Sequence, residues 1–258
     1  MSQRTGIEWT DSTWNPVTGC TQVSTGCDNC YALTLAHRLL RDVYTARKPE
    51  RNTAGNRADP FAVRTWPERL TEPLRWTEPR RVFVNSMGDL FHADIPDGFV
   101  RAVFDVMLAA DMHIYQVLTK RPARMERWVR QNFDLFGVDG VPPHIWLGTS
   151  VEDQSVAYRV DHLRRVPANV RFLSCEPLLG PVDFALHDIH WVIAGGESGI
   201  KHRTLSLDWV RTLRNACTMA GVPFFFKQVG GRTPKAGGRL LDGRVWSEYP
   251  SAVELSPR

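Results

Sequence analysis

Short runs of β-branched and aromatic residues recur at fairly even intervals along this chain, separated by segments with helical spacing. Six of these runs predict buried strands, at 81–85, 113–118, 144–148, 170–174, 190–194 and 223–227. Helices are expected at 97–110, 123–132, 152–166 and 206–220. Strands that alternate with helices in this order pair in parallel through right-handed crossovers, so the pattern predicts a parallel α/β fold.

A further strand over 7–13 and a helix over 32–46 raise the number of strand and helix units to about seven. The chain also lacks a nucleotide-binding glycine fingerprint. Both observations favour a complete or partial TIM-like parallel barrel over an open doubly wound sheet. With 258 residues, of which 43% are hydrophobic, the chain can bury one large core, so we expect a single barrel domain over 1–258.

Two segments do not follow this alternation. Residues 47–80 are rich in Pro and Arg and predict an irregular insertion, either a lid over the site or a surface excursion. Residues 230–250 predict a Gly-rich loop and a short hairpin over Leu240 to Trp246, with Asp242 and Gly243 at its turn.

Three cysteines, Cys20, Cys27 and Cys30, lie within eleven residues after the first predicted strand. Three thiolates can hold a 4Fe-4S cluster and leave one iron open to an outside ligand. Zinc with a fourth ligand is an alternative, as are a disulfide or ordinary thiols. A total of five cysteines and no secretory segment at the start of the chain disfavour the disulfide. Cys217 is predicted to be a core residue, and the role of Cys175 stays open.

Polar residues follow nearly every predicted strand, and chemistry in parallel barrels gathers at the carboxyl ends of the strands. Polar residues in these places are also typical of solvent-facing turns, so the pattern is informative only as a whole. These residues are Ser86, Gly88, Asp89, Lys120, Arg121, Ser150, Glu152, Glu176 and Glu197. We take Glu176, Glu197 and Lys120 as candidate catalytic residues, and His92 as the best-placed histidine.

Several motifs resemble a phage- and prophage-associated three-cysteine-motif family of unknown function, over nearly the whole chain. They are Thr13 to Cys20, the Gly-Glu-Ser-Gly run from Gly196 to Gly199, and Phe226 to Gln228. More distantly, the cysteine loop, the barrel pattern and Tyr31 after the last cysteine resemble the radical S-adenosylmethionine superfamily. That superfamily usually spaces its cysteines by three and then two residues with an aromatic before the last, whereas here the first gap is six residues and Asn29 stands in the aromatic place.

The superfamily resemblance implies a 4Fe-4S cluster on the three cysteines, with S-adenosylmethionine bound at the open iron. An electron from a partner donor would then cleave the sulfonium to a 5′-deoxyadenosyl radical. Asp89 matches the place of the carboxylate that receives the methionine amino group. The residues implied as cofactor contacts are Tyr31, Ser86, Gly88, Asp89 and Ser150.

Positive charges suggest a polyanionic substrate, although the net charge of +4 is mild. The candidate nucleic-acid contacts are Arg121, Arg124 and Arg127, spaced by three on one helix, and Lys201 and Arg203 after a Gly-rich turn. A solvated helix face is the alternative for the three arginines.

Together these features predict an iron-sulfur enzyme that modifies or repairs nucleic acid or a nucleotide. One rival is a nucleic-acid-binding protein stabilised by zinc or an inert cluster, without S-adenosylmethionine chemistry. Another is metal-assisted hydrolysis with Asp89, Glu176 and Glu197. No run of 18 apolar residues occurs, so we expect a cytoplasmic protein without a membrane partner.

Overall fold

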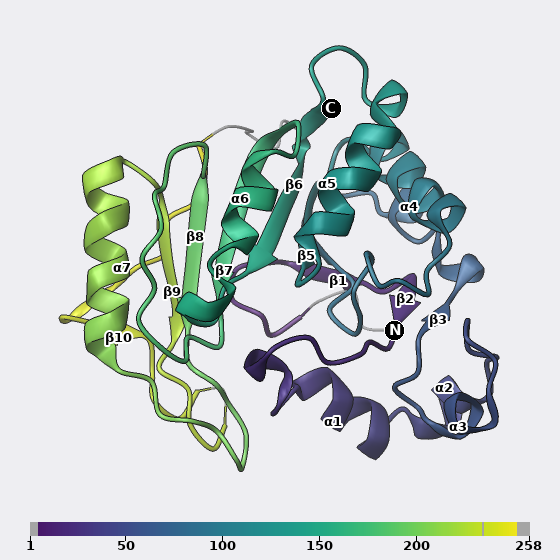
Figure 1. Ribbon diagram of the computed structural model, residues 1–258, viewed down its shortest axis with the longest axis horizontal. Helices are drawn as coiled ribbons and strands as arrows, with labels where there is room; N and C mark the ends of the chain where they lie inside the picture. Colours follow the sequence, from purple (N-terminus) through teal and green to yellow (C-terminus); the bar gives the residue numbers. More distant parts are fainter. Residues whose placement is uncertain (1–4, 234, 252–258) are drawn as a thin grey trace.

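The core of the computed structural model is a seven-stranded sheet in which every neighbouring pair is parallel (Figure 1). The structure describes residues 5–233 and 235–251. The prediction that the chain has no secretory segment rests partly on residues 1–4, which lie outside the described part. In spatial order the strands are β1 (Ser12–Trp14), β4 (Arg81–Val84), β5 (Ile114–Thr119), β6 (Val141–Ser150), β7 (Ala168–Cys175), β8 (Trp191–Gly195) and β9 (Phe224–Gln228). The six strands predicted from 81–85 onward are confirmed.

The sheet curls into a half-barrel with helices on its outer side (Figure 1). These helices are α4 (Asp97–Ala109), α5 (Pro122–Gln131), α6 (Arg159–Arg164) and α7 (Leu207–Ala220). Strands β1 and β9 are the two edges, and no pairing joins them within the described residues. The prediction of a TIM-like barrel therefore holds in its partial form.

Alternation along the strands separates an inner from an outer core, because successive side chains point to opposite faces of a sheet. In β8, Trp191 and Ile193 belong to the inner aromatic cluster, whereas Val192 and Ala194 belong to the cluster under the helices. Trp9 also lies in the inner cluster, with its ring centroid 4.7 Å from that of Phe83. The residues before β1 thus fill the interior of the half-barrel.

Three predicted elements differ from the structure. The first strand begins at Ser12 and not at residue 7, because the preceding residues turn inward and Asp11 binds the backbone N–H and the guanidinium of Arg81. The helix over 32–46 is divided into α1 (Tyr31–Arg38) and α2 (Arg41–Thr45). The helix over 152–166 is a 3-10 turn at 154–156 followed by α6, because the Asp153 carboxylate caps the backbone N–H of Ser155.

Segment 47–80 contains α3 (Ala54–Ala58), β3 (Arg64–Thr65) and two 3-10 turns at 67–69 and 73–75. β3 pairs antiparallel with β2 (Val17–Thr18), outside the main sheet. The fully buried Arg64 donates to the backbone oxygens of Arg47, Ala62 and Asn56, so its charge ties the segment together. Segment 47–80 is therefore packed against the chain just before the cysteines.

The remaining elements are a 3-10 turn at 133–135 and a terminal hairpin. Strands β10 (Leu240–Leu241) and β11 (Arg244–Val245) pair antiparallel. Asp242 and Gly243 form the turn with φ of 53° and 75°, the left-handed conformation that such a two-residue turn requires. In the described part of the chain, no helix combines the length and the apolar character needed to cross a membrane.

Candidate functional site

The cysteine loop, Gly19 to Cys30, begins after β2 and ends where α1 starts. It therefore follows β2, which pairs with β3 outside the main sheet, and does not follow the first strand of the main sheet directly. Its only regular element is a 3-10 turn, η1 (Thr25–Cys27). Its start is fixed by close packing, because a Cβ at Gly88 would lie 2.9 Å from the carbonyl oxygen of Gly19. Gly88, predicted to bind a cofactor, thus gives the loop room to approach the end of β4.

Residues that follow β4, β5, β6 and β8 all hydrogen-bond to the cysteine loop or to the adjoining Tyr31. The pairs are Tyr31 Oη to the Ser86 carbonyl (2.5 Å), Arg121 Nη1 to Cys20 Sγ (3.2 Å), Ser24 Oγ to Glu152 Oε1 (3.2 Å) and Asn29 Nδ2 to Glu197 Oε2 (2.9 Å). The structure therefore brings the predicted mouth residues and the three cysteines to one end of the half-barrel.

Asp89 orients Arg121 toward Cys20. Its carboxylate is buried and accepts bonds from Thr119 Oγ1 at 2.7 Å and from Arg121 Nη1 at 3.0 Å. It also accepts from the backbone N–H groups of Phe91 and Lys120. Burial and the negative charge of Asp89 raise the pKa of Cys20 to about 11, against the lowering effect of Arg121. Asp89 is thus occupied by protein donors, which differs from its predicted role of receiving an ammonium group.

Glu152 is the most deeply buried acid of the site, with a fully inaccessible side chain. It bonds Lys120 through Oε1, and Arg159 Nη1 lies 2.9 Å from Oε2. Burial raises the pKa of Glu152, but the charges of Lys120 and Arg159 outweigh this effect and hold the pKa below its usual value. Lys120, a predicted catalytic residue, therefore neutralises a buried carboxylate.

The loop passes so close to Glu152 that Gly26 has no space for a side chain. A Cβ there would lie 2.4 Å from Glu152 Cγ, and ionic bonds at the carboxylate keep Glu152 from moving aside. We expect Gly26→Ala to lower the free energy of unfolding by about 1–3 kcal/mol, the usual cost of overpacking. Urea titration measures this change.

Gly98→Ala is the matched control, because Gly98 lies in α4 with no atom within 4 Å of its Cβ position. Gly98 is in the first turn of α4, so this variant should be neutral or gain up to about 0.5 kcal/mol. Equal stability of the two variants would show that the cysteine loop does not rest on Glu152.

Glu197 binds the second half of the loop. Arg203 contacts both carboxylate oxygens, at 2.7 Å through Nη2 and 3.1 Å through Nε, and also donates 2.8 Å to the carbonyl of Thr25. Burial raises the pKa of Glu197, while hydrogen bonds from Arg203 and Asn29 lower it further than burial raises it. Arg203, predicted to contact nucleic acid, and Glu197, predicted to be catalytic, thus act together on the loop.

Glu176, a predicted catalytic acid, pairs with Lys227, and no hydrogen bond from either side chain to the loop is found among the described residues. Lys227 Nζ lies 2.5 Å from Glu176 Oε1, and both side chains retain some exposure. Glu176 directly follows β7, and Lys227 lies near the end of β9. A Cβ at Gly195, between them on β8, would lie 3.3 Å from Glu176 Cδ, so glycine leaves this ion pair its place.

A family model described as a protein of unknown function (DUF5131) matches residues 4–250. The chain belongs to this family. No curated protein and no solved structure matches the chain. The match in DUF5131 includes the cysteine loop and every strand of the half-barrel.

The other predicted residues of this DUF5131 member have different surroundings. Arg124 binds the backbone oxygens of His92 and Ile95 and the carboxylate of Asp97, so it holds the connection between β4 and α4. Ser150 is buried, and its carbonyl accepts a bond from Arg159. Arg127 and Lys201 are exposed at the surface.

His92 reaches the cysteine loop through a hydroxyl group. Its Nε2 lies 2.8 Å from Thr21 Oγ1, and Thr21 also receives the Nη2 of Arg121. Burial lowers the pKa of His92, and the nearby Arg121 lowers it further.

The five cysteines are free thiols, and the three predicted cluster ligands share one loop. Cys20, Cys27 and Cys30 are partly buried, and all three belong to the loop at the carboxyl end of the sheet. Within residues 5–233 and 235–251, no group of three or more Cys, His, Asp or Glu is arranged to hold a metal ion. The donor set thus fits an iron-sulfur centre in residue type and access, and the sulfur atoms are not gathered around a common point.

The two remaining cysteines lie elsewhere. Cys217 is fully buried on α7, which confirms its predicted core position. Cys175, whose role the sequence left open, is buried in the same outer core under the helices.

Sequence reasoning missed Arg159 and Asn29 and did not select Lys227. The only signal for Lys227 is its place at the end of an apolar strand. Arg159 is the first residue of α6 and looks like an ordinary surface residue in the sequence, but its side chain is buried against Glu152. Only the folded chain reveals that Arg159 is a partner of Glu152 and that Asn29 is a partner of Glu197.

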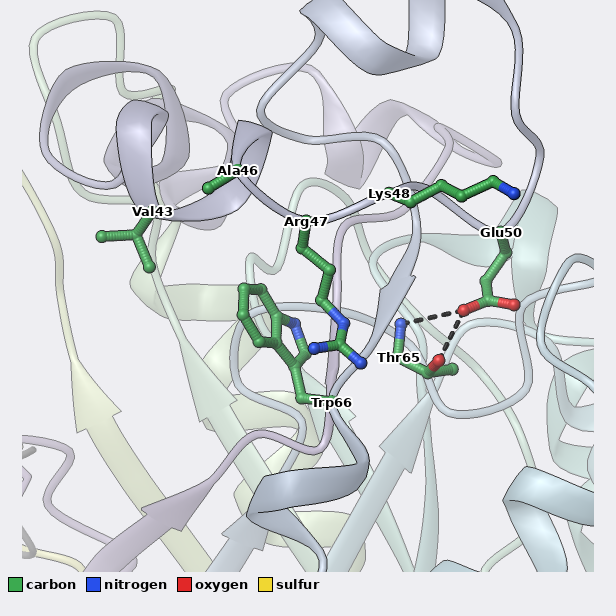
Figure 2. A pocket seen from close by; sticks show the side chains of 7 residues that line it. All are labelled: Val43, Ala46, Arg47, Lys48, Glu50, Thr65 and Trp66. Carbon is green, nitrogen blue, oxygen red and sulfur yellow. Dashed lines mark hydrogen bonds between the residues drawn. The ribbon is translucent and has the colours of Figure 1, made fainter.

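A cavity of about 460 Å³ lies between α2 and segment 47–80 (Figure 2). The guanidinium of Arg47 lies 4.9 Å from the centre of the Trp66 ring and also pairs with Glu68. Glu50 accepts bonds from the backbone N–H and the hydroxyl of Thr65 (Figure 2). Trp66 belongs to the cluster against which Cys20 and Cys30 pack, so this region supports the loop from outside.

Proposed function

We propose that this chain is a 4Fe-4S protein of radical S-adenosylmethionine type that acts on nucleic acid or a nucleotide, in a phage or prophage setting. One observation carries the proposal: three free, partly exposed cysteines lie on a loop that residues after four parallel strands hold at the carboxyl end of a half-barrel. That end is where parallel barrels place their chemistry.

Cys20, Cys27 and Cys30 would be the three cluster ligands. When bound, the cluster supplies the electron that cleaves the sulfonium of S-adenosylmethionine, after reduction by a partner donor. The protein's own contribution is to fix the loop: Arg121 does this at Cys20, near its start, and Glu197 does it at Asn29, near its end.

Glu176 and Lys227 are the residues we assign to ligand binding. Their charges lie at the same end of the sheet, and in the described part of the chain neither side chain is hydrogen-bonded to the loop. A carboxylate and an ammonium offer complementary contacts to the amino and carboxylate groups of a methionyl moiety or to polar groups of a substrate. Asp89 is assigned instead to positioning Arg121, because protein donors surround its carboxylate.

The test is reductive cleavage of S-adenosylmethionine by protein purified without oxygen. We expect release of 5′-deoxyadenosine from wild-type protein given a low-potential reductant, and loss of most of this product in Glu176→Gln. Arg211→Gln is the control, because Arg211 pairs with Asp208 and Asp242 on the outer surface. Protein that carries iron but never forms 5′-deoxyadenosine would exclude the radical mechanism, and about one zinc per chain with no iron would favour the structural-metal alternative.

A further inference from the structure

A cavity of about 330 Å³ opens between the start of α5 and the start of α6. Lys120, Arg121, Arg124 and Arg127 line it, and none of its lining residues is Asp or Glu. Such a cationic lining favours an anionic group, and phosphate is the anion that arginine recognises well. The cavity is next to the cysteine loop, since Arg121 lines it and also contacts Cys20.

The structure distinguishes the four cations of this cavity by what they already bind. Lys120 pairs with Glu152, Arg121 with Asp89, and Arg124 with Asp97. Arg127 is exposed, and no ion pair to it is found in the described part of the chain. Arg127 is therefore the cation that can take up a new anion without breaking an existing bond.

An aromatic ring stands at the same cavity. Tyr158, directly before α6, has 58% of its surface exposed and lines the cavity with His162. Its only ring partner in the described residues is the edge of His162, at a centroid distance of 6.4 Å. Exposed aromatic rings beside cations are the usual platforms on which nucleobases stack.

We propose that this cavity is a nucleotide subsite in which Arg127 binds a phosphate and Tyr158 stacks on the adjoining base. The proposal deepens the substrate part of the proposed function, and it depends on α5 and α6 and not on a cluster. It makes a single-stranded segment of nucleic acid the substrate class, because Arg127 and Tyr158 are exposed and the unpaired bases of a single strand, unlike those of a duplex, are free to stack on a ring.

The test is binding of a fluorescein-labelled single-stranded oligonucleotide and of a 5′-mononucleotide, followed by anisotropy and competition. We expect Tyr158→Ala to weaken oligonucleotide binding about 5- to 100-fold, and Tyr158→Phe to retain it. Arg127→Gln should weaken binding and reduce the slope of log K against log salt by about 0.7. Arg51→Gln is the matched control, because Arg51 is exposed in segment 47–80 and does not line this cavity.

Wild-type affinity in both Arg127→Gln and Tyr158→Ala would overturn the subsite. So would a loss of affinity in Arg127→Gln that is no larger than the loss in Arg51→Gln. Mononucleotide binding as tight as oligonucleotide binding would overturn the assignment to a strand. Measuring a Cys20, Cys27 and Cys30 to Ala variant separates the two proposals: binding that still follows Arg127 and Tyr158 upholds the subsite even if the protein never holds iron. Circular dichroism of every variant checks the fold.

Discussion

Wild-type protein purified without oxygen should contain about four irons and as much sulfide per chain, and Cys27→Ala should lose most of both. Cys27 lies in η1, the centre of the cysteine loop, and a three-thiolate site that loses one of its ligands cannot retain a cluster of this kind. Broad visible absorption should fall with the iron content. Metal analysis and the absorption spectrum together measure the effect.

Cys217→Ala is the matched control, because Cys217 is a buried thiol on α7 and lies outside the loop. It removes one sulfur from the chain but none from the proposed site, so its iron content should equal that of wild type. Equal iron loss in the two variants would indicate that unfolding, and not ligand removal, explains the result. Iron retained in both would exclude the cysteine loop as the site.

The central strands could be predicted from the sequence because both of their faces are buried, which makes them rich in apolar residues. Each central strand is covered on one face by helices and on the other by the inner aromatic cluster, so β8 reads as a continuous apolar run and the end of β7 stays buried despite Arg171 and Ser174. The edge is different. β1 has three residues. In the chain before it, Ile7 and Trp9 pack in the interior with the polar Glu8 between them, so this alternation resembled a strand that is not there.

The candidate site could be predicted only as a set of residues at one end of the sheet. The sequence placed Glu152, Glu197 and Arg121 there because each follows a strand. It could not say which charges pair, since pairing depends on distances between segments far apart in the chain. Glu152 and Lys120 are 32 residues apart, and Asn29 and Glu197 are 168 apart. For this reason Arg203 and Lys120 looked like free cations in the sequence.

Glu152→Gln should be among the most destabilising single substitutions in this protein. The change keeps the size of the side chain but leaves Lys120 and the buried Arg159 without a counter-charge. Removing one partner of a buried ion pair typically costs about 3–5 kcal/mol, because the remaining charge stays desolvated. A lower midpoint of urea unfolding, with an unchanged slope, would measure this loss.

Glu68→Gln is the matched control for this substitution. Glu68 also pairs with an arginine, Arg47, at 2.9 Å, but its side chain is 58% exposed. Exposed pairs contribute about 0.2–1 kcal/mol, so Glu68→Gln should be nearly neutral. Similar losses in the two variants would show that Glu152 does not carry a buried charge pair.

The pH dependence of stability gives an independent measure of the same pair. Burial raises the pKa of Glu152, but the charges of Lys120 and Arg159 outweigh burial and hold the folded pKa below its ordinary value of about 4.5, so folding favours the ionised form. The stability it contributes is therefore complete above pH of about 4.5 and is lost as the pH falls through the folded pKa. Wild-type protein should lose this component on acidification, whereas Glu152→Gln, which has no carboxylate to protonate, should start lower and lose less. Parallel pH profiles for the two proteins would mean that the carboxylate of Glu152 has the same pKa folded and unfolded, and its ion pairs would then contribute nothing to holding the cysteine loop.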